Sequence, residues 1–388
     1  MRTTVDDKTL VPVYEYFNFE VTKNLKDDSA VSLHFGAWGR GDLADKSTGK
    51  ETDGDLRYGY LSYRSSKGNT VANAGRQFIS EGVISEKLDG LYLRNDFKAG
   101  IGAAVYVGKS VYTETDSKTG GILYGTRISH RMPDYYTIGL SALKSEREDG
   151  GRYREEEGVD IWLHPSRLVD LAGRTTYNSI TSGFMEHAYT LTVIPMEKLN
   201  FSADLSGINY KDFLYNVTTN SLSLTGGNMN PNEKMLAVGG AVSYIPMKNV
   251  MVSANYRNYS YDIAGAANYF GGKVSYLDLD SFSAGASLYR MEGTSDRLRY
   301  CEARVYGSKK LASVILAADL HNVWYDRAIN GVKSSYVISG TAGYEFSQKV
   351  KIGAELEYGR SPDFDNDVRG LLKLTYRFDT KIGGGDKK

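Results

Sequence analysis

The sequence predicts an all-β chain that forms a single transmembrane antiparallel up-and-down β-barrel of about 20–22 strands. Three observations predict this fold. Apolar and polar residues alternate with a period of two along most of the chain. Short connections alternate with longer polar ones. The chain contains 30 tyrosines and 42 glycines but only 7 prolines, a composition typical of strands joined by tight turns.

The alternation is clearest in residues 199–207, 250–258 and 350–359. In the first of these, LNFSADLSG, the odd positions through Leu205 are apolar and the even positions are polar. We count about 21 such strand candidates, most of them near the ~9–11 residues that cross a tilted bilayer. Because bacterial barrels normally have an even number of strands, we expect 20 or 22, with a short first strand near residues 2–5.

The connections predict two different rims. The tight ones are residues 24–28, 65–69, 131–134, 195–198, 246–249, 307–310 and 347–349. The longer and more polar ones are residues 39–55, 108–121, 145–157, 216–234 and 359–367. This division predicts short periplasmic turns at one end of the barrel and longer extracellular loops at the other.

The ends of the chain differ from the patterned part. The alternation runs over residues 11–378 without an interrupting linker, so we expect one barrel domain. Residues 1–10 would be an N-terminal segment or a short first strand, and the glycine-rich residues 379–388 a flexible tail. The first residues carry no apolar signal core. Either a signal peptide has been removed or the protein stays in the cytoplasm, and the barrel pattern favours a mature chain of the bacterial outer membrane.

Several other classes of protein do not fit. The 47 basic and 47 acidic residues give no net charge, which argues against nucleic-acid binding. The single cysteine, Cys301, excludes an internal disulfide and a multi-cysteine zinc or haem-attachment site within the chain. No metal-ligand spacing, phosphate loop or nucleophile elbow is present. Asp319 and His321 share a strand face, which we interpret as a solvated polar pair. We therefore expect neither an enzyme nor a cofactor.

Aromatic residues recur where the apolar rows end. They are Tyr177, Tyr244, Tyr256, Tyr358, Tyr376 and Phe378. An amphipathic ring at the end of a strand favours the headgroup level of a bilayer. A soluble sandwich of this length would need several domains with linkers, and a propeller would show repeats of about 40 residues. Neither is found in the sequence, so the apolar rows are expected to contact outer-membrane lipid.

Two stretches resemble bacterial outer-membrane porins. Residues 369–378, RGLLKLTYRF, resemble the terminal assembly signal of outer-membrane proteins, with Tyr376 and Phe378 as its aromatic residues, although a further segment, 379–388, follows. Residues 73–108 resemble general porins, in which a Gly-Arg strand leads to a loop folded into the pore and an Asp-Gly return. Here the elements would be Gly75-Arg76, the inward loop 80–88, and Asp89-Gly90.

The porin resemblance covers residues 11–378 at the level of the strand pattern. It implies an outer-membrane diffusion channel, which in this family can be a homotrimer. It also implies that Arg76 forms a constriction together with the acidic residues of the inward loop, Glu81 and Glu86.

If the apolar rows face lipid, the charged residues of the opposite parity face the lumen, because an Arg or Lys at the lipid midplane costs roughly 2–4 kcal/mol. The expected lumen residues are Arg57, Arg127, Asp160, Arg174, Asp204, Arg257, Glu302, Arg304, Asp319, Lys351, Glu355, Glu357, Lys373 and Arg377. Their mixed signs would create a transverse field without strong ion selectivity. Alternatively, these charges pair and merely satisfy a wet interior.

Two functions follow from the predicted barrel. The first is an outer-membrane porin, a passive diffusion channel for small hydrophilic solutes or ions through a water-filled lumen. The alternative is a structural sheath that holds a partner, such as a multihaem cytochrome, for electron transfer across the outer membrane. In that case the partner would supply the haem-binding motif. An adhesin acting through its loops is less favoured, because the loops are short.

Overall fold

The computed structural model describes residues 2–3, 9–43, 52–111, 119–146, 152–213, 230, 232–278 and 281–378. The chain forms two compact units. Unit 1 comprises Met1–Val11, Ser243–Asn255 and Asn268–Lys388, and unit 2 comprises Pro12–Val242 and Tyr256–Ala267. No helix in the described ranges has the length and apolarity needed to cross a membrane.

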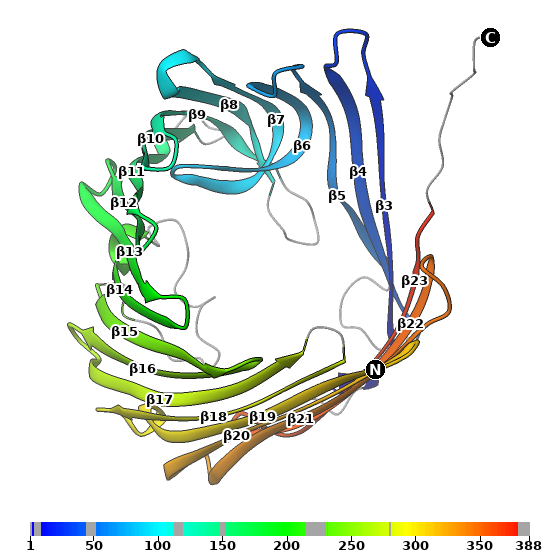
Figure 1. Cartoon of the computed structure of the whole chain (residues 1–388), viewed down its shortest axis with the longest axis vertical. Coiled ribbons are helices and arrows are strands. Elements are labelled where there is room, and N and C mark those ends of the chain that lie inside the picture. Colours follow the sequence, from blue (N-terminus) through cyan, green and yellow to red (C-terminus); the bar gives the residue numbers. More distant parts are fainter. Residues whose placement is uncertain are drawn as a thin grey trace. The chain divides into compact units, whose positions relative to one another are not determined.

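The predicted all-β, up-and-down architecture is confirmed. The described residues contain 21 long strands, β3 to β23, of 10–16 residues each. Every strand pair whose register is defined is antiparallel, and within β3 to β14 and within β18 to β23 consecutive strands are neighbours in the sheet (Figure 1). Helical structure among them is limited to short turns such as α1 (Tyr210–Phe213). The 21 long strands match the number of strand candidates counted in the sequence and the range of about 20–22. The expectation of an even number, 20 or 22, is not met by the long strands of the described residues.

Unit 2 is built on a continuous antiparallel meander from β3 to β14. Its strands are β3 (Pro12–Asn24), β4 (Ala30–Asp42), β5 (Thr52–Arg64), β6 (Thr70–Glu81), β7 (Ile84–Asp96), β8 (Ile101–Val111), β9 (Thr119–Met132), β10 (Tyr136–Glu146), β11 (Arg152–Ser166), β12 (Val169–Asn178), β13 (Gly183–Met196) and β14 (Leu199–Asn209).

Unit 1 contains a second meander, from β18 to β23. Its strands are β18 (Phe282–Gly293), β19 (Arg299–Leu311), β20 (Val314–Ile329), β21 (Val332–Glu345), β22 (Val350–Ser361) and β23 (Phe364–Tyr376). The short strand β1 (Arg2–Thr3) pairs with both β2 (Thr9–Leu10) and β23, at the place where a short first strand is expected. The units divide β15 (Lys234–Met247), β16 (Val250–Tyr261) and β17 (Gly265–Asp278) between them.

The described connections confirm most of the expected tight turns and correct two expectations. Residues 307–310 are not a turn, because they continue β19 and pair with both β18 and β20, and the chain reverses at Ala312-Ser313 instead. Residues 359–367 are not a long loop. Their polar side chains belong to β22 and β23, whose pairing continues to Ser361↔Phe364, so only Pro362 and Asp363 connect them. The described residues of the expected loops 39–55, 108–121 and 145–157 belong mostly to the flanking strands, and the middle of each loop lies outside the described residues. Most of the expected loop 216–234 lies outside them as well.

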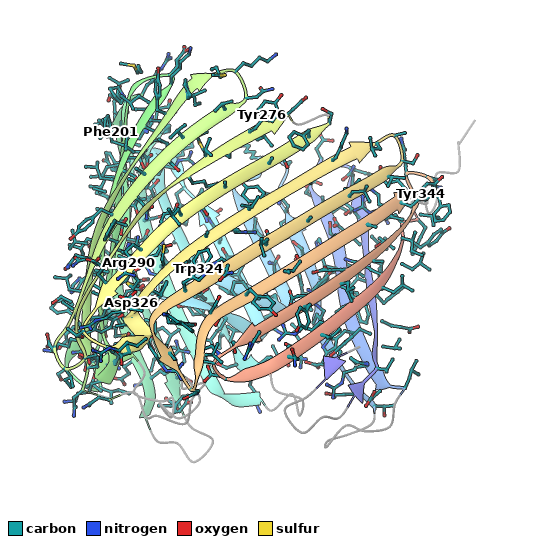
Figure 2. All side chains as sticks on the ribbon, turned by 90° about the horizontal axis from the view of Figure 1, so that it is seen from below. Phe201, Tyr276, Arg290, Trp324, Asp326 and Tyr344 are labelled. Carbon is teal, nitrogen blue, oxygen red and sulfur yellow. The ribbon has the colours of Figure 1, made fainter. Side chains whose placement is uncertain are left out.

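The apolar parity of the strands is the exposed one. In β22 and β23, Leu356, Leu372 and Leu374 are 62, 73 and 70% exposed. Aromatic rings lie at both ends of this apolar band in unit 1, with Trp324 near one end and Tyr344 near the other (Figure 2). An exposed apolar band bordered by aromatic rings is the surface that a bilayer covers.

The strands are longer than the expected ~9–11 residues because they extend beyond the apolar band. In β11, the outward-facing positions from Val159 to Leu163 are apolar, whereas Glu157 and Glu155, on the same parity, are charged. Charged residues on the outer face belong in water, so this end of the strand projects past the hydrocarbon.

This arrangement predicts that charge is tolerated on only one face of a strand. Leu356→Arg should make the chain folded in lipid vesicles less stable to unfolding by about 2–4 kcal/mol, because Leu356 lies on the exposed apolar face. Glu355→Arg, at the adjacent position on the opposite face, should change it far less. Denaturant titration of the folded fraction in vesicles measures both values. Equal losses for the two variants would contradict the assigned faces.

Candidate functional site

The β6–β7 hairpin leaves the wall of unit 2 halfway along its length. The two strands pair with each other from Thr70↔Asn95 to Glu81↔Ile84. However, β6 pairs with β5 only as far as Gly59↔Arg76. The far half, residues 77–88, turns to the concave side of the unit's sheet (Figure 1). We call residues 77–88 the inner hairpin. The expected inward loop at 80–88 is therefore two paired strands joined at Gly82-Val83.

Glycines allow the sheet to bend where the inner hairpin begins. Gly75 has a φ of +123°, which a residue with a side chain rarely adopts. Gly75 is paired with Gly90, which is in turn paired with Gly108. A Cβ atom on Gly75 would overlap the carbonyl oxygen of Gly59, and one on Gly90 would overlap that of Val107. The backbones approach too closely at this bend for any residue other than glycine.

Arg76 holds the corner at which the inner hairpin leaves β5. Its Nε and Nη2 donate to the two carboxylate oxygens of Asp89, at 2.8 and 2.9 Å. Its Nη1 donates to Asp55 at 2.9 Å and to the carbonyl oxygen of Leu56 at 3.0 Å. The side chain is only 13% exposed. The structure thus places Arg76 beside Asp55 and Asp89, and its described partners do not include Glu81 or Glu86.

A small apolar core fixes the inner hairpin to the wall. Its members are Ile79, Ile84 and Leu88 of the hairpin and Tyr106, Leu123 and Leu143 of β8, β9 and β10. Each is at most 3% exposed. Burying an aliphatic side chain stabilises a fold by about 1.5–3 kcal/mol. Tyr106, Leu123 and Leu143 occupy the lumen-facing parity, where they would contact water if the hairpin did not cover them.

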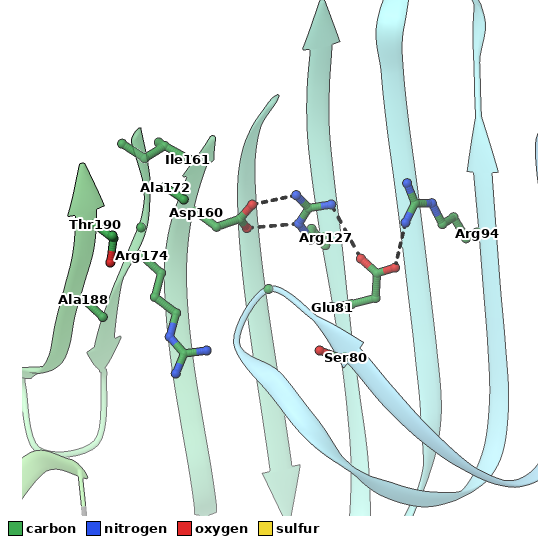
Figure 3. Close-up of a pocket in the computed structure, with 12 residues that line it drawn as sticks. Ser80, Glu81, Arg94, Arg127, Asp160, Ile161, Ala172, Arg174, Ala188 and Thr190 are labelled. Carbon is green, nitrogen blue, oxygen red and sulfur yellow. Dashed lines mark hydrogen bonds and ion pairs between the residues drawn. The ribbon is translucent and has the colours of Figure 1, made fainter. Parts of the chain in front are cut away.

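Glu81 connects the inner hairpin to the wall electrostatically. Its carboxylate is 7% exposed. It accepts hydrogen bonds from the Tyr92 hydroxyl at 2.6 Å and from Arg94 Nη1 at 3.2 Å, and it lies 3.6 Å from Arg127 Nη1 (Figure 3). Arg127 also donates twice to Asp160, at 3.0 and 2.6 Å. Glu81 and Asp160 thus hold Arg127 between the hairpin and β11.

Two further contacts hold the other side of the hairpin. Arg154 of β11 donates to Glu86 at 2.5 Å and makes two hydrogen bonds to Glu156. At the tip, the backbone amide of Val83 donates to Ser141 Oγ of β10 at 3.1 Å. The inner hairpin is therefore attached to β9, β10 and β11, and it lies along the wall as a lining.

The opposite face of the inner hairpin is open. Phe78 is 60% exposed, and Ser80, Ser85 and Lys87 lie on the same face by register. Beside it, a hollow of about 600 Å³ is lined by Ser80, Arg94, Arg127, Asp160, Arg174 and Thr190, among others (Figure 3). Asp160 lies between Val159 and Ile161 of the apolar band, so the hollow is at the depth of the hydrocarbon.

The remaining expected lumen residues of unit 2 lie on its polar face. Arg174 donates to Glu186 at 2.8 Å. Arg257 donates to Asp204 at 2.5 Å. Arg57 occupies a β-bulge, because the β4–β5 register skips it, and its guanidinium lies 5.7 Å from the centroid of the Tyr16 ring.

Most of the expected lumen residues of unit 1 share one face of its sheet. Arg304 binds the Asp319 carboxylate, with its Nε 3.0 and 2.9 Å from the two oxygens. Glu302 accepts a hydrogen bond from Tyr269 at 2.5 Å and lies 3.6 Å from His321. Glu355, Glu357, Lys351 and Lys373 lie on the same face by strand register, and Arg369 pairs with Glu357 at 3.5 Å. Arg377 follows the end of β23, and its backbone amide donates to the carbonyl oxygen of Lys349 at 2.8 Å.

These contacts bear on two of the expectations. The many ion pairs agree with the interpretation that the lumen charges satisfy one another, whereas a role in a constriction stays a prediction. Tyr376 ends β23, and its ring stacks with that of Phe378 at a centroid distance of 6.3 Å. Both rings are exposed. Their role as an assembly signal also stays a prediction.

The chain is similar in fold to several solved structures, although no sequence comparison finds a match. No protein-family model matches it, and no curated protein matches it in sequence. The siderophore receptor PirA from Pseudomonas aeruginosa has a TM-score of 0.55 at 12% identity, over 94% of this chain and 77% of that one. A mutant of the ferric enterobactin receptor PfeA from the same organism has a TM-score of 0.53 at 10% identity, over 97 and 72%. The chain has the fold of an outer-membrane β-barrel.

A further solved structure aligns with the chain at a lower TM-score. OccK8 from Pseudomonas aeruginosa has a TM-score of 0.44 at 10% identity, over 94% of this chain and 96% of that one. Identities this low indicate shared fold and not shared function.

The site predicts that Glu81 stabilises the inner hairpin. Glu81→Gln removes the negative charge between Arg94 and Arg127, and breaking a mostly buried ion pair costs about 3–5 kcal/mol. Amide hydrogen exchange of residues 77–88 in detergent should accelerate accordingly. Asp204→Asn, which removes a carboxylate from another ion pair of unit 2, is the matched control and should leave exchange in residues 77–88 unchanged. Unchanged exchange in Glu81→Gln would contradict this role.

Proposed function

We propose that the chain is an outer-membrane porin, a passive diffusion channel for small hydrophilic solutes or ions through a water-filled lumen of mixed charge. One observation carries the proposal. In both units, one face of the sheet is apolar and exposed, whereas the opposite face carries the ionic side chains. A barrel with lipid outside and charged groups inside encloses water, because charges of this number require solvation.

The inner hairpin is the proposed narrowing element of this channel. It occupies space on the polar face of unit 2, and its own apolar core together with Glu81 and Glu86 keeps it in place. Arg76 acts at the corner by holding the strand bend. Because most described charges near the hairpin have partners of opposite sign, we infer weak selectivity between cations and anions.

A structural sheath is the second candidate. Porins of 16–18 strands already enclose an aqueous channel, and this chain has 21 long strands in its described residues. A wider barrel could hold a protein partner such as a multihaem cytochrome. The inner hairpin favours the channel over the sheath, because it takes up lumen space that a partner would need.

Conductance separates the two candidates. The purified chain, inserted in a planar bilayer, should give stable open steps in potassium chloride. The absence of conductance, together with co-purification of a haem protein from the native membrane, would support the sheath and overturn the channel. Crosslinking in the membrane would at the same time test the homotrimer that the porin resemblance implies.

The corner arginine gives a sharper test of the narrowing element. Arg76→Ala removes three hydrogen bonds to carboxylates and one to a carbonyl oxygen, so the hairpin should detach from the corner. Each such bond contributes about 1.5–3 kcal/mol. The single-channel conductance should rise, or its noise should increase. Arg297→Ala, in the β18–β19 connection, is the control. A conductance identical to wild type in Arg76→Ala would remove the hairpin as the narrowing element.

A further inference from the structure

Arg174 differs from the other arginines that line the hollow beside the inner hairpin. Arg94 donates to carboxylates through all three of its guanidinium nitrogens. Arg127 donates to Asp160 through Nε and Nη2, and its Nη1 lies 3.6 Å from the Glu81 carboxylate. Within the described part of the chain, Arg174 donates only through Nε, to Glu186. Its side chain is 50% exposed. Figure 3 shows its guanidinium pointing into the hollow, so that the two terminal nitrogens form an open fork there.

Small residues make room in front of this fork. Ala172, Gly173 and Ala188 of β12 and β13 line the hollow next to Arg174. The hydroxyl-bearing side chains of Ser80, on the inner hairpin, and Thr190, on β13, line it as well. A hollow of about 600 Å³ is within the size range of small-molecule sites. It therefore offers a bidentate cationic donor, two hydroxyl groups and space for a small solute.

The acidic residues near the hollow are each bound by an arginine. Asp160 is bound by two nitrogens of Arg127, and Glu81 is shared between Arg94 and Arg127. Glu186 is bound by Arg174 Nε. Counted with Asp96, which also binds Arg94, four carboxylates are paired with three arginines, so the cluster carries no excess of positive charge. Recognition of an anion therefore rests on the open fork of Arg174, which matches the two oxygens of a carboxylate.

We propose that this hollow is a transient binding subsite for small carboxylate-bearing solutes, held by the Nη1 and Nη2 groups of Arg174. The proposal rests on the proposed channel function and names a class of solute for it. Glu186 weakens the attraction because it shares the guanidinium charge. Weak binding suits a channel, since a solute that binds too tightly would not leave.

The test uses the full-length chain in planar bilayers in potassium chloride, with succinate added on one side. Succinate should reduce the open-channel current with saturation in the wild type. In Arg174→Gln the half-blocking concentration should rise about tenfold, the effect of losing charged hydrogen bonds worth roughly 1.4 kcal/mol or more. Arg174→Lys keeps the charge but lacks the fork, so it should fall between the two.

Two controls separate the subsite from general lumen charge. Arg257→Gln removes the same charge from an arginine that does not line the hollow, and it should keep the wild-type half-blocking concentration whatever its effect on conductance. Inorganic phosphate tests the alternative oxyanion. Block by phosphate without block by succinate would overturn the carboxylate assignment, as would equal succinate block in wild type and Arg174→Gln.

Failure of the channel is distinguishable from failure of the subsite. A wild-type chain that conducts but shows no saturable succinate block leaves the channel standing and overturns the subsite. If the wild type carries no current, the channel itself is refuted. Equilibrium binding of radiolabelled succinate to the detergent-solubilised chain then decides the subsite, with binding lost in Arg174→Gln as support and equal binding in both chains as refutation.

Discussion

The high free energy of a charge or an unpaired backbone group in hydrocarbon determines how the strands pair and which side chains they point outward. Strands in a bilayer must pair on both sides, and their outward side chains must be apolar. Alternate residues point to opposite faces, so this requirement imposes a period of two on the sequence. The exposed leucines of β22 and β23 meet it on one face, and the glutamates and lysines between them occupy the other. The inner charges then stabilise one another, as Arg304 and Asp319 do.

The inner hairpin of unit 2 departs from this pattern, because it leaves the sheet and lies on the polar face. A segment that enters the lumen loses its neighbour on one side and must be held by side chains. Ile79, Ile84 and Leu88 bury themselves against the wall, and Glu81 places a carboxylate between two arginines. Gly75 and Gly90 permit the bend. The result is a lining with its own core. Its side chains hold it on the wall along its length, whereas a loop attached only at its two ends has no such contacts.

Much of the fold could be predicted because the period of two is a local signal. Residues 199–207 pair as expected, with Asp204 on the polar face and Leu205 on the apolar one. The inward course of residues 80–88 was predicted from a porin resemblance, but as a loop. The hairpin itself is not signalled by alternation, because Gln77, Ile79 and Glu81 share one buried face although only Ile79 is apolar. The register of Arg76 could not be recognised, because the positive φ of Gly75 interrupts the alternation.

The small core was harder to predict. Leu123 and Leu143 lie on the polar parity of their strands, where a leucine contradicts the pattern. Such leucines are a signal that something covers the inner wall, but they do not indicate what covers it. The ion-pair partner of each expected lumen charge was equally hard to predict from the sequence. Arg127 and Glu81 are separated by 46 residues in the chain, and only the folded hairpin brings them together. The same holds for Arg154 and Glu86.

The most direct test of the whole account asks which medium contacts each face of β23. Single cysteines at Leu372 and at Lys373, in a chain with Cys301→Ala, can be labelled with a small fluorophore after folding into lipid vesicles. A quencher attached to the acyl chains should act on the label at Leu372 and not at Lys373, whereas a water-soluble quencher should act on Lys373. Quenching of both labels from the aqueous phase, with none from the acyl chains, would contradict the account.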